Sequence, residues 1–210
     1  MLMKKYMWWS LVVILVIAAA SWGPIASQVE QAKYKVITTE GNIQVRDYAP
    51  IIVAEVEVSG DRDKAINQGF RMIADYIFGN NLTEHKIAMT APVIQEKSEK
   101  VAMTAPVMQQ GAGNVWKVRF VMPAQYSLAT LPKPNNLAVK LNKIPKKHFV
   151  AITFSGMAKE EDLKFYSDQL NNFIKAKGLH AISTEIYAFF NPPWTLPFLR
   201  RNEIMVEIQK

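Results

Sequence analysis

The sequence predicts an α+β domain in which many strands are combined with two helices. Only two stretches, between Asp61 and Gly79 and from about Lys159 to Lys177, carry apolar residues at the spacing of an amphipathic helix. Short apolar or alternating runs of strand length recur along the rest of the body. Each helical stretch follows a strand and a glycine, which indicates two similar strand–helix–strand halves.

The first half begins with alternating residues over 51–58, which predict a strand that ends at Gly60. Asp61 is placed to cap the helix that follows, and Gly79 is placed to stop it. The apolar face of this helix consists of Ile66, Phe70, Ile73 and Ile77.

The second half repeats the plan with a strand at 149–154, Gly156, a helix and the stop residue Gly178. A shift of 96 residues places Gly60 on Gly156, so the two units align as a duplicated element. The remaining predicted strands are 43–47, 115–121, 137–141, 185–190 and 203–209, together with a hairpin over 86–109.

The hairpin is predicted from a segment that occurs twice, IAMTAPV at 87–93 and VAMTAPV at 101–107. A polar stretch, 96–100, lies between the two apolar runs, as in a β-hairpin. Two interpretations stay open. The hairpin packs a core with Met89 and Met103 as gap-fillers, or its doubled Met/Thr/Pro surface lines a ligand groove.

Composition excludes several classes of site. The 210 residues include no cysteine, which rules out disulfides, zinc–thiolate sites, iron–sulfur clusters and thiol nucleophiles. The net charge of +7 includes Lys4 and Lys5 at the N-terminus, and no dense basic helix accompanies it, so we expect no nucleic-acid partner.

The N-terminus predicts export. Lys4 and Lys5 precede an apolar run that extends from Met7 to Trp22. We interpret 1–26 as a signal peptide or membrane anchor, 27–33 as a tether and 34–210 as the folded domain. Positive residues before the run place the N-terminus inside and the body outside the cytoplasm, inner-membrane anchored or secreted into the periplasm.

The doubled AMTAPV motif resembles the SOUL / heme-binding protein family. The resemblance covers most of the chain beyond the N-terminus. It includes, in order, YKVI…GNIQVRDYAP (34–50), GNN (79–81), VRFVMP (118–123), LPKPNN (131–136), FSG (154–156) and NPPW…RRNEIM (191–205).

The resemblance implies a strongly curved, mostly antiparallel sheet or distorted barrel carrying two helices. It also implies a binding protein for haem or another tetrapyrrole. Some members have a proposed haem-ligating histidine where this chain has Asp47, and others have a basic helix residue where it has Asn67. We therefore expect weak haem binding, micromolar or weaker, held mainly by an apolar groove.

The residues expected to form this groove come from the first helix and the hairpin. They are Phe70, Met72 and Ile73 on the helix and Met89 and Met103 on the hairpin. Of the three histidines, His85 is best placed as an axial ligand, because it lies just before the doubled motif.

Two further features of the sequence have alternative interpretations. Arg200 and Arg201 either hold Glu203 in a local network or bind an anionic group such as a propionate. His148 ends a lysine-rich run that is a solvated edge, or that meets an anionic membrane or a carboxylate.

Two other functions stay open beside a binding protein. One is a small-molecule hydrolase that uses Glu185 or Glu203 as a buried base, although the chain has no G-x-S-x-G motif and no phosphate loop. The other is an envelope protein without a ligand, which binds a partner through its exposed sheet edges.

Overall fold

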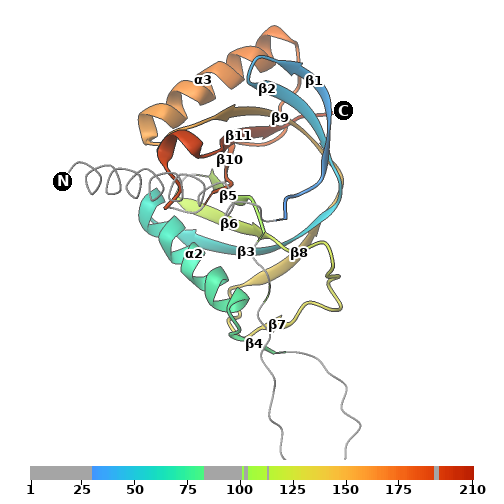
Figure 1. Ribbon diagram of the computed structural model, residues 1–210, viewed down its shortest axis with the longest axis vertical. Coiled ribbons are helices and arrows are strands. Elements are labelled where there is room, and N and C mark those ends of the chain that lie inside the picture. Colours follow the sequence, from blue (N-terminus) through green and yellow to red (C-terminus); the bar gives the residue numbers. More distant parts are fainter. Residues whose placement is uncertain (1–29, 83–100, 102–103, 113, 192–193) are drawn as a thin grey trace, which may run out of the picture.

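The domain is built on a curled antiparallel sheet that carries two helices (Figure 1). The computed structural model describes residues 30–82, 101, 104–112, 114–191 and 194–210. The strands of the main sheet are β1 (Tyr34–Glu40), β2 (Ile43–Tyr48), β3 (Ile51–Ser59), β5 (Val107–Ala112), β6 (Val115–Val121), β8 (Lys140–Ile144), β9 (Lys147–Phe154), β10 (Ile186–Phe189) and β11 (Asn202–Glu207). A small second sheet pairs β4 (Asn81–Leu82) with β7 (Lys133–Pro134). The helices are α2 (Arg62–Ile77), α3 (Glu160–Ala176) and the short 3-10 helix η1 (Pro197–Leu199).

The order of the strands confirms the two similar halves. Across the sheet they lie in the order β1-β2-β9-β11-β10-β5-β6-β3-β8. Apart from β1, this order is symmetrical about the contact between β10 and β5. One half is β3-α2-β5-β6, and the other is β9-α3-β10-β11, each with its helix on the same side of the sheet (Figure 1).

The strand that precedes each half in sequence, β2 or β8, pairs with the first strand of the other half. β2 precedes β3 in sequence but pairs with β9, and β8 precedes β9 but pairs with β3. In one exchange Tyr48 lies opposite Lys147, and in the other Ile144 lies opposite Ile51. Residues 48 and 144, like 51 and 147, are 96 positions apart. The offset predicted from the sequence is therefore the one that relates the two registers.

Glycines fix the geometry at both helices. Gly60 (φ 123°) and Gly156 (φ 117°) adopt the left-handed region at equivalent strand ends. Gly69, in the middle of α2, lets the helix approach the sheet closely, since a Cβ there would lie 2.7 Å from a methyl carbon of Val118. Asp61 occupies the N-cap of α2, but its side chain makes no capping hydrogen bond, which corrects our expectation.

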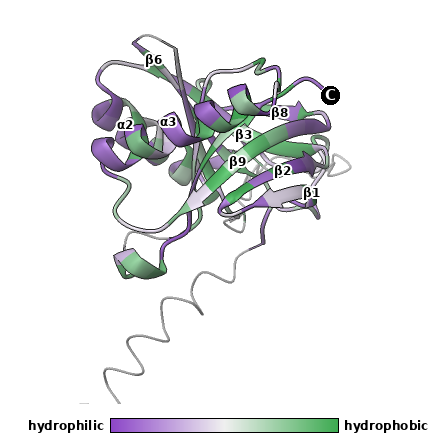
Figure 2. Ribbon diagram, turned by 90° about the horizontal axis from the view of Figure 1, so that it is seen from above, coloured by the Kyte–Doolittle hydropathy of each residue, from purple (hydrophilic) through white to green (hydrophobic). Residues whose placement is uncertain are grey.

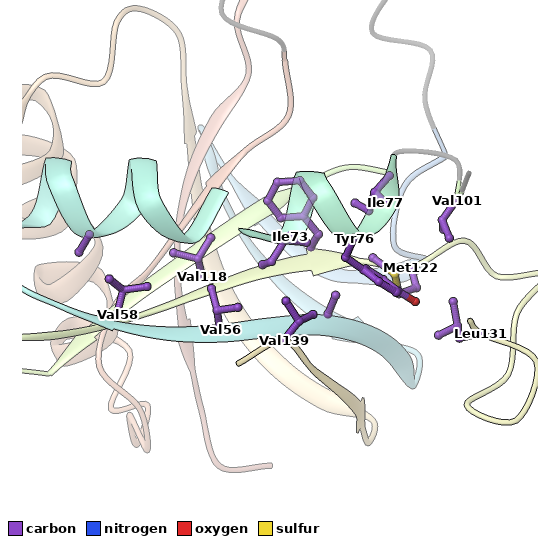
Figure 3. Close-up of a cluster of buried hydrophobic side chains, with 13 residues drawn as sticks. Val56, Val58, Ile73, Tyr76, Ile77, Val101, Val118, Met122, Leu131 and Val139 are labelled. Atoms are coloured by element: carbon purple, nitrogen blue, oxygen red, sulfur yellow. The ribbon is translucent and has the colours of Figure 1, made fainter. Parts of the chain in front are cut away.

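Three hydrophobic clusters fill the domain. One lies between α2 and strands β3 and β6, and Figure 3 shows Ile73 of the helix directed at Val56 and Val118. A second lies between α3 and strands β9 and β11. The third contains no helix residue and occupies the other face of the sheet, with Phe149 and Met205 among its members. In Figure 2 the hydrophobic residues, in green, are concentrated on strands such as β3 and β9, whereas α2 and α3 also carry hydrophilic segments, in purple.

Two strands of the main sheet, β1 and β8, differ from the prediction. Strand β1 was not predicted, because most of its residues are exposed and give no apolar alternation. The strand predicted over 137–141 is wrong, since Leu137 is 83% exposed and the strand β8 starts at Lys140. This strand has a polar sequence at a sheet edge, and the apolar signal upstream misplaced it.

The doubled segment lies mostly outside the described residues. Of the second copy, Val101 is buried beside α2, and Ala105 forms an isolated parallel bridge with Gln31. The strand itself begins only at Val107, later than predicted. Pro106 has no N–H to donate, so it cannot take part in a regular ladder.

Residues 30–33, the last part of the predicted tether, pack on the domain. The backbone N–H of Ala32 donates to the carbonyl of Ala105, and the N–H of Ala105 donates to the carbonyl of Glu30. Across the part of the chain that is described, no helix is long and apolar enough to cross a membrane. The predicted anchor, 1–26, lies outside that part.

Candidate functional site

A cavity of about 590 Å³ lies where residues 30–33 cross the bend between β2 and β3. We name it the outer cavity. Its walls are the segments 30–33, 49–52 and 121–129, with Thr104 and Lys143. Pro50, Ile51, Met122 and Leu128 make much of this wall apolar. The volume lies within the ordinary range for small-molecule sites.

A smaller pocket of about 250 Å³, the inner pocket, lies on the helix-free face of the sheet. It shares Ala32, Ala49, Ile51 and Lys143 with the outer cavity, so the two adjoin. Its walls come from both halves of the sheet and include Tyr48, Ile144, Met108, Phe149, Ile186 and Met205. The inner pocket therefore lies across the symmetry axis that relates the halves.

The outer cavity has two lysines on its wall. Lys33 and Lys143 are exposed, and neither forms an ion pair with a residue in the described part of the chain. The acid on the same wall, Glu30, accepts a hydrogen bond from the backbone N–H of Ala124 at 3.0 Å. The cavity thus combines apolar walls with two cations that can meet carboxylates.

A third, open depression of about 380 Å³ adjoins the outer cavity through Lys33, Ala49 and Pro50. We name it the lysine depression, because Lys33, Lys35 and Lys146 surround it.

Asp47 also lines this depression and is tied to two bases. Its carboxylate contacts the Nδ1 atom of His148 and lies 3.3 Å from the Nζ atom of Lys146. Burial alone would raise the pKa of Asp47, but the hydrogen bonds from His148 and Lys146 outweigh it and hold the pKa below its ordinary value.

A buried charge network lies beside these pockets. Glu203 has a fully buried side chain and accepts hydrogen bonds from Arg46 (2.7 Å and 3.0 Å) and Arg201 (2.7 Å and 2.9 Å). Thr153 donates a further bond to Glu203 at 3.1 Å. Burial would lower the pKa of Arg46, but the bond and charge of Glu203 outweigh it and raise the pKa.

Aromatic rings cover this network. Tyr34 lies on the guanidinium of Arg46, with the carbon of that group 4.5 Å from the ring centre, and packs on Tyr48. Phe190 covers Arg201 at 4.0 Å. Burial raises the pKa of Tyr48 to about 12, so its hydroxyl stays neutral throughout the physiological range.

The structure separates the predicted helix residues from the cavities described above. Ile73 is fully buried in the core under α2, and Met72 packs against the same cluster. Phe70 is 38% exposed and its ring contacts Phe120, with centres 5.2 Å apart. None of the three lines the outer cavity, the inner pocket or the lysine depression.

The predicted hairpin residues His85, Met89 and Met103 lie outside the described residues. The segment that contains them is represented at the site by Thr104 on the wall of the outer cavity and Pro106 on that of the inner pocket.

The two predicted arginines differ. Arg201 bonds Glu203, as in the local network that was one of our two interpretations, whereas the Nε of Arg200 donates to the carbonyl of Thr195 at 2.8 Å. Neither arginine lines the three pockets.

Sequence reasoning missed the residues that form the cavities. Lys33 was assigned to a tether, and Lys143 appeared only as a member of a basic run. The available signal was Pro50 at the end of the segment 46–50, RDYAP, because proline marks a bend and a bend between two long strands leaves space beside it.

Several solved structures share this fold. The C-terminal domain of EcmrR is 12% identical with a TM-score of 0.56, and the match covers 84% of this chain and 98% of that one. A structure titled as a hydrolase from Listeria innocua is 13% identical with a TM-score of 0.51, covering 82% and 94%. An uncharacterized conserved protein from Listeria innocua is 12% identical with a TM-score of 0.52, covering 86% and 94%.

Among curated proteins no similar sequence was found. The family model described as SOUL heme-binding protein matches residues 29–207.

Proposed function

Because the family match spans most of the chain, this protein belongs to the SOUL heme-binding protein family, and we propose that it binds haem or another tetrapyrrole in the outer cavity. One observation carries the proposal. A largely apolar cavity of about 590 Å³ has two lysines on its wall, Lys33 and Lys143, that form no ion pair with any described residue. A tetrapyrrole with carboxylate side chains has a flat apolar ring for such walls and anionic groups for such lysines.

The wall suits the ring and carboxylates better than the iron. Its described residues include no histidine, and Met122, the sulfur-bearing one, is only 3% exposed and packs in the core beside α2. We therefore propose that binding rests on apolar contact and carboxylate pairing. Asp47, which stands where some family members have a proposed haem-ligating histidine, lies on the lysine depression with two basic partners rather than on this wall.

The test is a titration of the full chain with hemin and with iron-free protoporphyrin IX. We expect micromolar dissociation constants that agree within about threefold, since the metal adds little. Lys33→Glu and Lys143→Glu should each weaken binding of both compounds at least about fivefold by replacing attraction with repulsion. Lys175→Glu, an exposed lysine on α3, is the matched control and should change nothing.

His85→Ala separates this proposal from iron ligation. We expect most hemin affinity to survive the change. If the variant no longer binds hemin but still binds protoporphyrin, His85 ligates the iron. If the unmodified protein shows no saturable binding of either compound, the tetrapyrrole site is refuted.

A hydrolase is less well supported. Glu203 accepts bonds from two arginines and Thr153, which leaves it unsuited to take a proton from a substrate. Glu185 is held by Asn171 at 2.9 Å and by Tyr187 at 3.0 Å. The solved structure titled as a hydrolase supports the fold at 13% identity and no reaction here.

We also propose that the domain lies outside the cytoplasm, anchored or released at its N-terminus. The support is the charge and apolar pattern of residues 1–26. Protease added outside the inner membrane, in spheroplasts if the host is Gram-negative, should digest the domain. Protection until lysis would place the domain in the cytoplasm.

A further inference from the structure

The lysine depression is a charged surface that the proposed ligand site does not fully use. Lys33 and Lys35 are both exposed, and neither forms an ion pair with any residue in the described ranges. Lys146 is 54% exposed and shares its acid, Asp47, with His148. Three lysines therefore face one shallow surface on which Asp47 is the only acid among the described lining residues.

We propose that this face of the domain docks on an anionic membrane surface. Lysines near such a surface are attracted by the negative potential of its headgroups. An open depression edged by lysines suits many shallow contacts with headgroups better than it suits one enclosed anion.

Chain length supports the same occupant. Residues 30–32 line the outer cavity and lead into the edge, formed by Lys33, Ala49 and Pro50, that it shares with the lysine depression. The apolar run that we predict to enter the membrane ends at Trp22, eight positions before Glu30. Eight residues span about 28 Å at full extension, so this edge is the part of the domain held nearest the membrane.

The α3 side of the domain has the opposite charge. The helix, Glu160–Ala176, carries four acids, Glu160, Glu161, Asp162 and Asp168, and two lysines, Lys164 and Lys175. An anionic surface repels this side while it attracts the lysine depression, so the charge distribution orients the domain on its tether.

Docking in this orientation sets the outer cavity beside the bilayer. An amphiphilic ligand with carboxylates would then pass between the lipid and the cavity without crossing water. This consequence rests on the proposed ligand site, whereas the docking itself does not.

The absence of cysteine makes a direct test practical. A single cysteine is introduced as Leu128→Cys, at the mouth of the outer cavity, or as Phe165→Cys on α3, and carries a fluorophore. Both positions are well exposed, at 45% and 57%. The full chain is reconstituted in phosphatidylcholine vesicles with or without phosphatidylglycerol, and headgroup spin-labelled lipid serves as quencher.

We expect strong quenching at Leu128→Cys in the anionic vesicles only, relieved by salt, and little quenching at Phe165→Cys. Adding Lys35→Glu and Lys146→Glu should reduce quenching at the mouth to the level of the Phe165→Cys probe. The matched pair Lys164→Glu and Lys175→Glu on α3 should leave it unchanged. Equal quenching in neutral and anionic vesicles, or equal quenching of the two probes, would overturn the proposal.

Two controls keep the outcome interpretable. Lys35→Glu with Lys146→Glu leaves Lys33 and Lys143 in place, so hemin titration in detergent should be unchanged, and loss of docking is then distinct from loss of the ligand site. Free glycerol phosphate at matched ionic strength should not relieve the quenching. Relief would indicate a pocket for a single headgroup and would contradict docking on a surface.

Discussion

Glu57–Lys117 and Thr153–Glu203 are equivalent residue pairs in the two halves of the sheet, and their surroundings are opposite. Glu57 and Thr153 lie 96 positions apart. Glu57 lies opposite Lys117 of β6, and Thr153 lies opposite Glu203 of β11. Lys117 and Glu57 form an open ion pair at 2.8 Å with side chains 41% and 56% exposed. Glu203 is fully buried and held by two arginines.

The difference arises from strand β1, which has no counterpart in the other half. β1 adds Tyr34 over Arg46, and Gln31, just before it, accepts a hydrogen bond from Arg201 at 3.1 Å. One added strand therefore turns a position that is solvated in one half into a buried charge network in the other. The comparison shows that the halves share topology while their electrostatics depend on what covers them.

A second pair of equivalent positions distinguishes the proposed ligand site from the corresponding place in the other half. Residues 47 and 143 are also 96 positions apart, and the first is an acid while the second is a lysine. Asp47 contacts His148 and Lys146, whereas Lys143 has no ion-pair partner in the described chain and lines the outer cavity. Of these two equivalent positions, only 143 therefore presents a cation that could pair with a ligand.

The largest effect that we expect comes from the buried acid. Glu203→Ala should destabilise the domain by about 3–5 kcal/mol, because it leaves Arg46 and Arg201 without their shared carboxylate. Glu57→Ala, the matched change in the open half, should have little effect. Urea unfolding followed by circular dichroism measures both, and similar losses in the two variants would remove the contrast between the halves.

A smaller effect is expected where the helices meet the sheet. Gly69 and Ser167 are the eighth residues of α2 and α3, and both are buried. Gly69→Ala places a methyl group 2.7 Å from Val118 and 3.1 Å from Val56, which should cost about 1–3 kcal/mol despite the better helix propensity of alanine. Ser167→Ala adds no atom and should change thermal stability little. A stabilised Gly69→Ala variant would show that α2 can shift away from the sheet.

The alkaline stability should depend on Tyr48. Its pKa is raised from 10.0 to about 12 in the folded state, so the neutral hydroxyl stabilises the fold fully below pH 10 and this contribution is lost between 10 and 12. The loss amounts to about 1.4 kcal/mol by about pH 11. Tyr48→Phe should therefore show a flatter decline of melting temperature over this interval, and an unchanged decline would mean that Tyr48 titrates normally.

The smallest effect concerns Asp47, the partly exposed counterpart of Lys143. Its lowered pKa means that the carboxylate stabilises the fold above 3.8 and that this contribution disappears as the pH falls through the folded value. Asp47→Asn should be slightly less stable than the unmodified protein at neutral pH, and the two should converge in acid. A constant difference down to acid pH would assign the effect to packing.

The elements with strong periodicity could be predicted, and those defined by polar edges could not. The helix faces around Ile73 and Leu170 follow from spacing, and the strand at 115–121 agrees with β6 at both ends. β1 and β8 are edge strands with exposed residues, and their sequences lack the apolar alternation that marks a strand.

The candidate site was harder to predict for a physical reason. Its walls come from 30–33, 49–52 and 121–129, which come together only after the sheet has curled. The sequence identified Glu203 and its arginine neighbour but not Arg46, which is 157 positions away along the chain. Conversely, Ile73 has the spacing of a core residue and is one, so it forms no wall of the described cavities.

The exchange of β2 and β8 between the halves determines the order in which strands can pair while the chain is being synthesised. β2 pairs with β1 on one edge, but the partner of its other edge is β9, where Ile43 lies opposite Ile152. A nascent chain that has emerged through β6 therefore has one edge of β2 and one edge of β3 without a partner. Such edges invite pairing with another copy, and contacts between distant positions form slowly. During synthesis these edges stay open until β9 is complete at Phe154, so we expect the first half to benefit from a holding chaperone.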